Sequence, residues 1–203
     1  MELFGISMTE LIRTAGYLGV FGIIFAESGL LVGLFFPGDS LLFTAGILAS
    51  QGYFNIVLLI FLSFAGAVFG DSFGYWFGKK IGPRIFVKED SLLFHRKHLR
   101  RAAIFYEKYG GLTVVLARFL PFIRTFAPIL AGVGKMPYAS FLFYNLLGAA
   151  LWAIGLPLTG FYLGLLIPDI DRYLIPLVLA IVVVTTIPVV AHFWKSRNSL
   201  NPE

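Results

Sequence analysis

Five ionisable side chains lie within or beside long apolar runs of this sequence, where a charge is costly. Two are arginines, set six residues apart in the stretch LTVVLARFLPFIRTFAPILAGVGKM, and three are carboxylic acids. In chain order they are Glu27, Asp39, Asp71, Arg118 and Arg124. An ionisable group surrounded by hydrocarbon normally faces protein or a water-filled cavity, and it marks a functional site by default. These five residues are therefore the first candidates for chemistry.

The two kinds of charge suggest two roles. Arginine presents a planar fork of donors that suits bidentate binding of a phosphate group, so Arg118 and Arg124 are candidate ligands for an anionic lipid head group. A carboxylic acid withdrawn from water binds a proton more readily, so Glu27 and Asp39 are candidate proton-coupling residues. Protonation of an acid that pairs with an arginine would release that arginine for substrate. Asp71 is an additional candidate.

Two other interpretations apply to the same residues, and the first of them stays open. The charges could pair as buried salt bridges that only fix the packing, although desolvation can exceed the Coulombic gain of such pairs. Catalysis is not expected, because the histidines (His95, His98 and His192) lie outside the broken apolar stretches and the chain has no cysteine. Metal-binding spacings and a serine-nucleophile elbow are also missing, so no metal or cofactor is expected.

The composition indicates a polytopic membrane protein. Of the 203 residues, 58% are hydrophobic and 13% are charged, whereas soluble domains have about 45–50% apolar and about 25% charged residues. Nine of the 16 Lys and Arg residues fall within 79–108, a pattern that indicates membrane topology and not nucleic-acid binding. The acidic residues Glu2 and Glu10, with no basic n-region, argue against a removable signal peptide.

Two stretches are predicted to enter the membrane, break and return to the same side. In residues 15–50 the helix breaks at Pro37 and Gly38, and the apolar piece that follows is too short to span, since spanning takes about 20 residues. In residues 112–136 the predicted breaks are Pro121 and Pro128. An unbroken helix would turn Arg118 and Arg124 apart by roughly 240°, whereas a break at Pro121 lets both point into one cavity.

The remaining segments complete an all-α membrane domain with about three to four full spans. Residues 1–14 form a lead-in, 54–78 a span, 79–111 a basic segment with an amphipathic surface helix, 138–167 and 173–194 two spans, and 195–203 a tail. Gly66, Gly70, Gly74 and Gly78 form a stripe that is typical of close helix packing. Asn145, within the 138–167 span, is a further candidate site residue.

The charges between the spans favour re-entry of the second hairpin. If 79–111 is cytoplasmic and 112–136 returns to its own side, the acidic 168–172 loop lies outside and the basic C-terminus is cytoplasmic. The two hairpins also resemble each other, with Ala45-Gly46 after the first break and Ala131-Gly132 after the second. Hairpins on opposite sides of the membrane form the inverted repeat of many transporters. The side of the N-terminus stays open.

Five segments together resemble the DedA family, bacterial membrane proteins that share the SNARE-associated or VTT domain with eukaryotic lipid scramblases. They are FAESGLLVGLFFPGDSLLFTAGILAS (25–50), GDSFGYWFGKKIG (70–82), FYEKYGG (105–111), ARFLPFIRTFAPILAGVGKM (117–136) and YNLLGAALW (144–152). The resemblance implies opposed re-entrant hairpins and lipid movement across the bacterial cytoplasmic membrane, with undecaprenyl phosphate or a phospholipid as substrate and a link to the proton-motive force. It also implies functional roles for Glu27, Asp39, Arg118 and Arg124.

We therefore expect a non-enzymatic, proton-linked flippase for an anionic lipid in the cytoplasmic membrane, supporting envelope and membrane homeostasis. An uncoupled phospholipid scramblase and a structural or assembly protein with buried salt bridges are the alternatives. The expected partners are membrane lipids and protons, with no nucleic acid, and self-association into a homo-oligomer stays open.

Overall fold

The computed structural model describes residues 2–3, 6–30, 38–85 and 110–167. Two short strands, β1 (Glu2–Leu3) and β2 (Ile6–Ser7), pair antiparallel before the first helix. The helices are α1 (Met8–Gly29), α2 (Gly38–Ser50), α3 (Ile56–Ile85), α5 (Leu112–Ala117), α6 (Pro121–Val133) and α7 (Tyr138–Leu166). Apart from the strand pair, the described part is helical, as the hydropathy pattern predicts.

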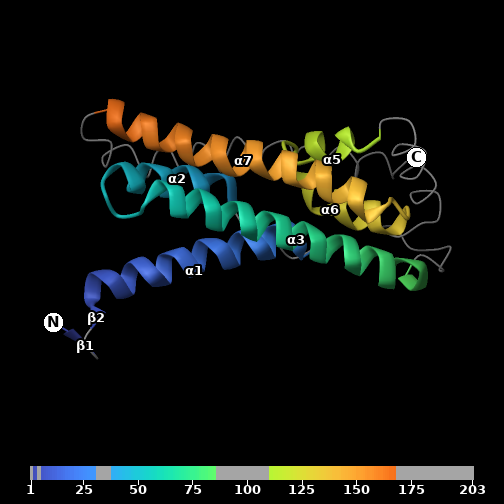
Figure 1. Ribbon diagram of the computed structural model, residues 1–203, viewed down its shortest axis with the longest axis horizontal. Coiled ribbons are helices and arrows are strands. Elements are labelled where there is room, and N and C mark those ends of the chain that lie inside the picture. Colours follow the sequence, from blue (N-terminus) through green and yellow to red (C-terminus); the bar gives the residue numbers. More distant parts are fainter. Residues whose placement is uncertain (1, 4–5, 31–37, 86–109, 168–203) are drawn as a thin grey trace, which may run out of the picture.

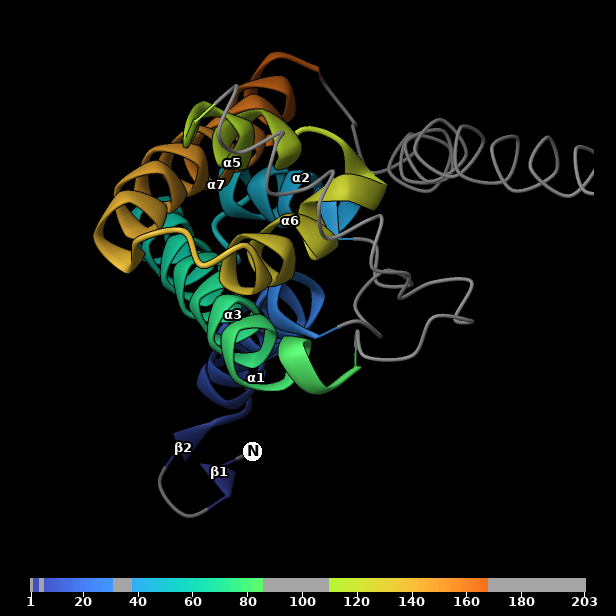
Figure 2. The ribbon, with the colours of Figure 1, turned by 90° about the vertical axis from the view of Figure 1, so that its right-hand side faces the viewer.

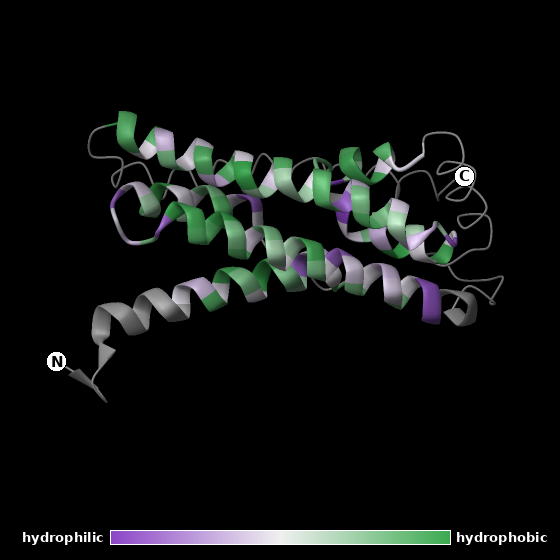
Figure 3. Ribbon diagram, in the orientation of Figure 1, coloured by the Kyte–Doolittle hydropathy of each residue, from purple (hydrophilic) through white to green (hydrophobic). Residues whose placement is uncertain are grey.

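Two long apolar helices, α3 and α7, form the frame of the molecule. They lie side by side and run in opposite directions (Figure 1). Residues Ile56–Ile81 of α3 and all 29 residues of α7 are long and apolar enough to cross a membrane, because 26 residues of helix rise by about 39 Å. Figure 3 shows hydrophobic residues along α7 and the first half of α3, whereas the second half of α3 is paler and becomes hydrophilic near its basic end.

The shorter helices α2 and α6 lie on one side of the α3–α7 pair (Figure 2). Each has 13 residues, a rise of about 20 Å, which is less than the hydrocarbon thickness of about 30 Å. α2 packs against α7, the long helix of the other half of the sequence, and α6 packs against α3. α1 packs against α3, and the six-residue α5 packs against α7.

The glycine stripe of α3 provides close packing for both halves of the chain. A side chain at Gly66 or Gly70 would meet the backbone of α1, at Phe21 and Phe25, and one at Gly78 would overlap the backbone of α6 at Ile129. The stripe therefore has the packing role that its spacing predicts, with α1 on one part of α3 and α6 on the next.

The contacts of α2 with α7 and of α6 with α3 follow one pattern. A side chain at Gly46 of α2 would overlap the carbonyl of Pro157 in α7, and one at Gly160 of α7 would overlap the carbonyl of Phe43 in α2.

The α6–α3 pair repeats this arrangement. A side chain at Gly132 of α6 would overlap the carbonyl of Tyr75 in α3. One at Gly78, three residues further along α3, would overlap the carbonyl of Ile129, three residues before Gly132. Each short helix thus exchanges two glycine-to-carbonyl contacts with the long helix of the opposite half.

One predicted break needs correction, and two helices extend beyond the segments predicted for them. α1 begins at Met8, within the predicted lead-in, and α3, which overlaps the predicted 54–78 span, runs from Ile56 to Ile85. Pro128 does not break α6, which runs through it to Val133. Prolines are tolerated in such helices where neighbouring elements pack around the freed carbonyl, and Pro128 is fully buried. Pro37, most of the 79–111 segment, the 173–194 span and the tail lie outside the described residues.

Candidate functional site

Arg124 joins the ends of three helices. It is the fourth residue of α6, and it forms ion pairs with Glu27, near the end of α1, and with Asp39, at the start of α2. Its Nη1 lies 2.6 Å from Asp39 Oδ1. Glu27 is only 2% exposed, whereas the Asp39 side chain is 20% exposed. Arg124 thus pairs with one carboxylate that is shielded from solvent and with another that is partly exposed.

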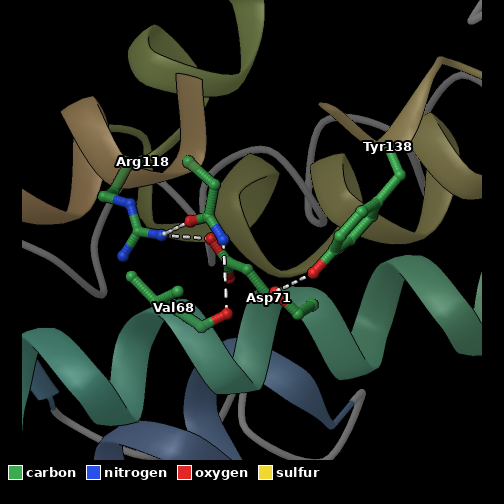
Figure 4. Close-up of polar contacts among 6 residues, drawn as sticks. Val68, Asp71, Arg118 and Tyr138 are labelled. Carbon is green, nitrogen blue, oxygen red and sulfur yellow. Dashed lines mark hydrogen bonds and ion pairs between the residues drawn. The ribbon is translucent and has the colours of Figure 1, made fainter. Parts of the chain in front are cut away.

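Arg118 forms a second buried ion pair next to the first. It is the residue directly after α5, is 4% exposed, and pairs with Asp71 in the middle of α3. Its Nη2 also donates to Asn145 Oδ1 at 2.7 Å, and Asn145 Nδ2 donates to the carbonyl of Val68 at 3.3 Å (Figure 4). Asn145 therefore fixes Arg118 while it also connects α7 to α3.

The break that separates the two arginines lies just before Pro121. α5 ends at Ala117, Leu120 has an extended backbone with φ −110° and ψ 103°, and Pro121 is the first residue of α6. A proline suits this first helical position, because its missing N–H would have no partner there. Arg118 and Arg124 consequently lie on either side of this break, and both line a void of about 10 Å³.

Trp152 connects the two ion pairs. Its indole Nε1 donates to Asp39 Oδ1 at 2.8 Å. Its ring lies 5.4 Å from the guanidinium carbon of Arg124 and 5.9 Å from that of Arg118, within the range of cation–π attraction. The sequence analysis did not select Trp152. A usable signal was its spacing of seven residues from Asn145, which places both on one face of the helix.

The described charges do not balance at this site. Three carboxylates face two guanidinium groups, so the formal sum is 2 − 3 = −1 when all are ionised. Glu27 Oε2 is buried without a hydrogen-bond partner among the described residues. A side chain at position 38 would overlap the Glu27 carboxylate, so any residue larger than glycine there would displace that carboxylate. The five charged residues predicted from the sequence are thus brought together, with an excess of acid.

A cavity of about 460 Å³ opens beside this cluster, between α2, the residues after α5, and α7. We call it the α7 groove. Its polar end is formed by Asp39, Arg118 and Trp152, and the lining beyond them is mostly apolar. Among the described residues, no group of three or more His, Cys, Asp or Glu side chains could hold a metal ion. The arrangement suits an amphipathic ligand better than a metal ion.

Sequence comparisons relate the chain to known proteins. Residues 36–162 match the model of the VTT domain, which covers the described chain from α2 almost to the end of α7. The chain is 40% identical to Protein DedA of Escherichia coli strain K12 over 199 residues, covering 96% of this chain and 90% of that protein. The chain belongs to the DedA family.

Other DedA relatives have names that place them in membranes. A membrane protein of Mycobacterium leprae is 41% identical over 177 residues, covering 87% of this chain and 79% of the relative. Inner membrane protein YghB of Escherichia coli K12 is 34% identical over 157 residues, with coverages of 77% and 71%. No solved structure matches the chain. This DedA family chain is thus a membrane protein, and within its described residues α3 and α7 are long and apolar enough to cross the membrane.

Proposed function

We propose that this DedA family protein moves an anionic lipid across the cytoplasmic membrane, with uptake of protons and without catalysis. Arg118 and Arg124 would bind the lipid phosphate, and Glu27 and Asp39 would couple binding to protons. The observation that supports this most directly is the position of both arginines. They lie among three carboxylates beside a groove whose lining is mostly apolar.

The proposed fold is an inverted repeat in which two re-entrant hairpins meet near the middle of the membrane. Two observations support it. The 13-residue helices α2 and α6 are too short to span, and each packs against the long helix of the opposite half. The repeated glycine-to-carbonyl contacts of Gly46 and Gly132 support the same relation. In transporters of this design, the substrate site lies where the two broken elements meet.

The charge excess supplies a reason for proton coupling. A phosphate that approaches the cluster meets a formal charge of −1, so binding is disfavoured while all three carboxylates are ionised. Protonation of Glu27 or Asp39 would remove one negative charge and one partner of Arg124. That guanidinium could then donate to a phosphate oxygen, while the other carboxylate keeps it in place. We infer that the proton and the lipid phosphate enter the site together.

The substrate class in this proposal is a polyprenyl phosphate, such as undecaprenyl phosphate, or an anionic phospholipid. The residues select a phosphate through the guanidinium forks of Arg118 and Arg124. They do not select the chain attached to the phosphate, so the two lipid types are to be compared by experiment. In the proposed topology the 79–111 segment and the C-terminus are cytoplasmic.

The opposing candidate is a structural membrane protein, and one observation favours it. Each arginine already has a carboxylate partner, so the cluster could serve only to join the helices. In that case the protein would contact the membrane lipids without transporting them.

The test is a flipping assay with purified protein in liposomes that contain labelled undecaprenyl phosphate or labelled phosphatidylglycerol. We expect the wild type to flip at least one of these lipids and Arg124→Ala to lose that activity, with folding checked by circular dichroism. Absence of flipping for both lipids, in folded wild-type protein, would contradict the proposal and support the structural role. Flipping that ignores a proton gradient would instead support an uncoupled scramblase.

A further inference from the structure

The α7 groove has a polar end and an apolar wall. Beyond Asp39, Arg118 and Trp152, its lining consists of Phe43 of α2, Phe119, and Leu151, Gly155, Leu156 and Thr159 of α7. Eight residues of helix separate the first and last α7 residues of this lining, which corresponds to a length of about 12 Å. The groove therefore extends from the charged cluster along the second half of α7.

The wall of the groove offers no free side-chain hydrogen-bond donor. Thr159 is its one hydroxyl residue, and the Thr159 Oγ1 donates to the carbonyl of Gly155 at 2.7 Å within the same helix. A water molecule held in a cavity needs two to four polar partners, and the lining beyond the polar end does not provide them. An apolar occupant therefore fits this part of the groove better than a file of water.

The groove opens among exposed apolar residues. Leu151 is 60% exposed and Phe119 is 53% exposed, and α7 is long and apolar enough to cross a membrane. Exposed apolar residues of a spanning helix contact the hydrocarbon chains of membrane lipids. The space beside Gly155 is open, since a Cβ added to this residue would have no atom within 4 Å.

We propose that the α7 groove holds one hydrocarbon chain of the transported lipid, with its head group at the Asp39–Trp152 end. This inference rests on the proposed function for the identity of the lipid, but the chain site itself can be tested without transport. The occupant combines a phosphate that reaches the arginines with a chain that lies along α7. The groove would thereby align the head group with the charged cluster before the lipid moves.

The test fills the groove without disturbing its walls. In Gly155→Phe a ring enters the empty space, and Gly22→Phe is the matched control, because a Cβ at Gly22 of α1 also has nothing within 4 Å and Gly22 is not part of the groove lining. Each protein is placed in liposomes that contain phosphatidylglycerol with a photoreactive group in one acyl chain. Labelled residues are located by mass spectrometry, and Phe61, a 63% exposed residue of α3, reports contact with bulk lipid.

We expect strong labelling of Phe43 and Trp152, groove residues that are only 8% and 5% exposed, in the wild type and in Gly22→Phe. This labelling should be lost in Gly155→Phe, while Phe61 is labelled equally in all three. Equal labelling of Phe43 and Trp152 in the two variants would overturn the proposal. Thr159→Trp, which adds bulk further along the groove, gives a second measurement if Gly155→Phe does not fold.

Two further results separate this inference from the proposed function. The chain lacks cysteine, so Thr159→Cys carries a single thiol. Modification of that thiol by a membrane-impermeant reagent would mean that water fills the groove, and it would overturn the chain site even if lipids are flipped. Groove labelling that Gly155→Phe removes, in a protein that flips no lipid, would support the chain site and contradict the proposed function.

Discussion

The indole of Trp152 donates to the same Asp39 oxygen that accepts a hydrogen bond from Arg124, although Trp152 and Asp39 lie 113 residues apart. This shared oxygen connects α2, α6 and α7 at one point. The Trp152 ring also lies near both guanidinium groups. A change at Asp39 that moves this ring would therefore alter the surroundings of both arginines. Trp152 is therefore placed to couple the state of the carboxylate to the arrangement of the arginines.

Trp152→Phe tests this connection. The variant keeps an aromatic ring near the arginines but removes the donor to Asp39, and a hydrogen bond to a charged group contributes about 1.5–3 kcal/mol. We expect a lower thermal unfolding temperature in detergent and slower lipid flipping. The control is Trp76→Phe, since Trp76 is an exposed residue of α3 outside the cluster. Equal effects of the two substitutions would mean that the Asp39 bond has no special role.

Arg118→Lys separates phosphate binding from simple ion pairing. The substitution keeps the positive charge beside Asp71 but removes the planar fork that also reaches Asn145. We expect lipid flipping to fall by about tenfold or more, equivalent to about 1.4 kcal/mol, in protein that remains folded. Unchanged flipping in Arg118→Lys would argue that this residue serves only as a charge partner.

The Arg118–Asp71 pair is expected to show strong coupling in the free energy of unfolding. Removing one partner of a buried pair costs about 3–5 kcal/mol, because the other charge stays buried and unpaired. Asp71→Asn and Arg118→Gln should each destabilise the protein, and the double variant should be more stable than the sum of the two losses predicts. Chemical denaturation of all four proteins completes the cycle. Additive losses would contradict the pairing.

The repeated helix contacts predict matched effects of two glycine substitutions. Gly46→Val and Gly132→Val each place a side chain against a carbonyl of the opposite long helix. We expect both to lower the free energy of unfolding by a similar amount, about 1–3 kcal/mol. Gly19→Val is the control, because a Cβ at that residue meets nothing within 4 Å. A loss confined to one of the two contacts would argue against an equivalent role for α2 and α6.

The gathering of the charged residues could be predicted from their types and depth. Arg118 and Arg124 lie in an apolar stretch that also holds Pro121, and a break there was the simplest way to direct both toward one cavity. Pairing of the arginines with the three acids was one interpretation that the sequence left open, because an unpaired charge is costly in an apolar environment. The packing of the α3 glycine stripe followed from its four-residue spacing. In each case the cause is local in the sequence.

The pairing of particular partners could not be predicted in this way. Any of the three acids could have neutralised either arginine, and the observed choice depends on how α1, α3 and α6 pack in three dimensions. Trp152 was missed for a similar reason, since a tryptophan in an apolar helix is usually explained by packing alone. Pro128 was wrongly expected to break the helix because its sequence does not reveal the neighbours that surround it.

Proton-coupled transport is the central claim, and the most direct measurement is flipping of labelled undecaprenyl phosphate in liposomes with and without an inward proton gradient. The wild type is compared with Glu27→Gln, which removes one titratable partner of Arg124 and nearly preserves side-chain size. We predict that the gradient accelerates flipping by the wild type and that Glu27→Gln shows no response to it. A wild-type rate that does not change with the gradient, or an equal response in Glu27→Gln, would contradict this account.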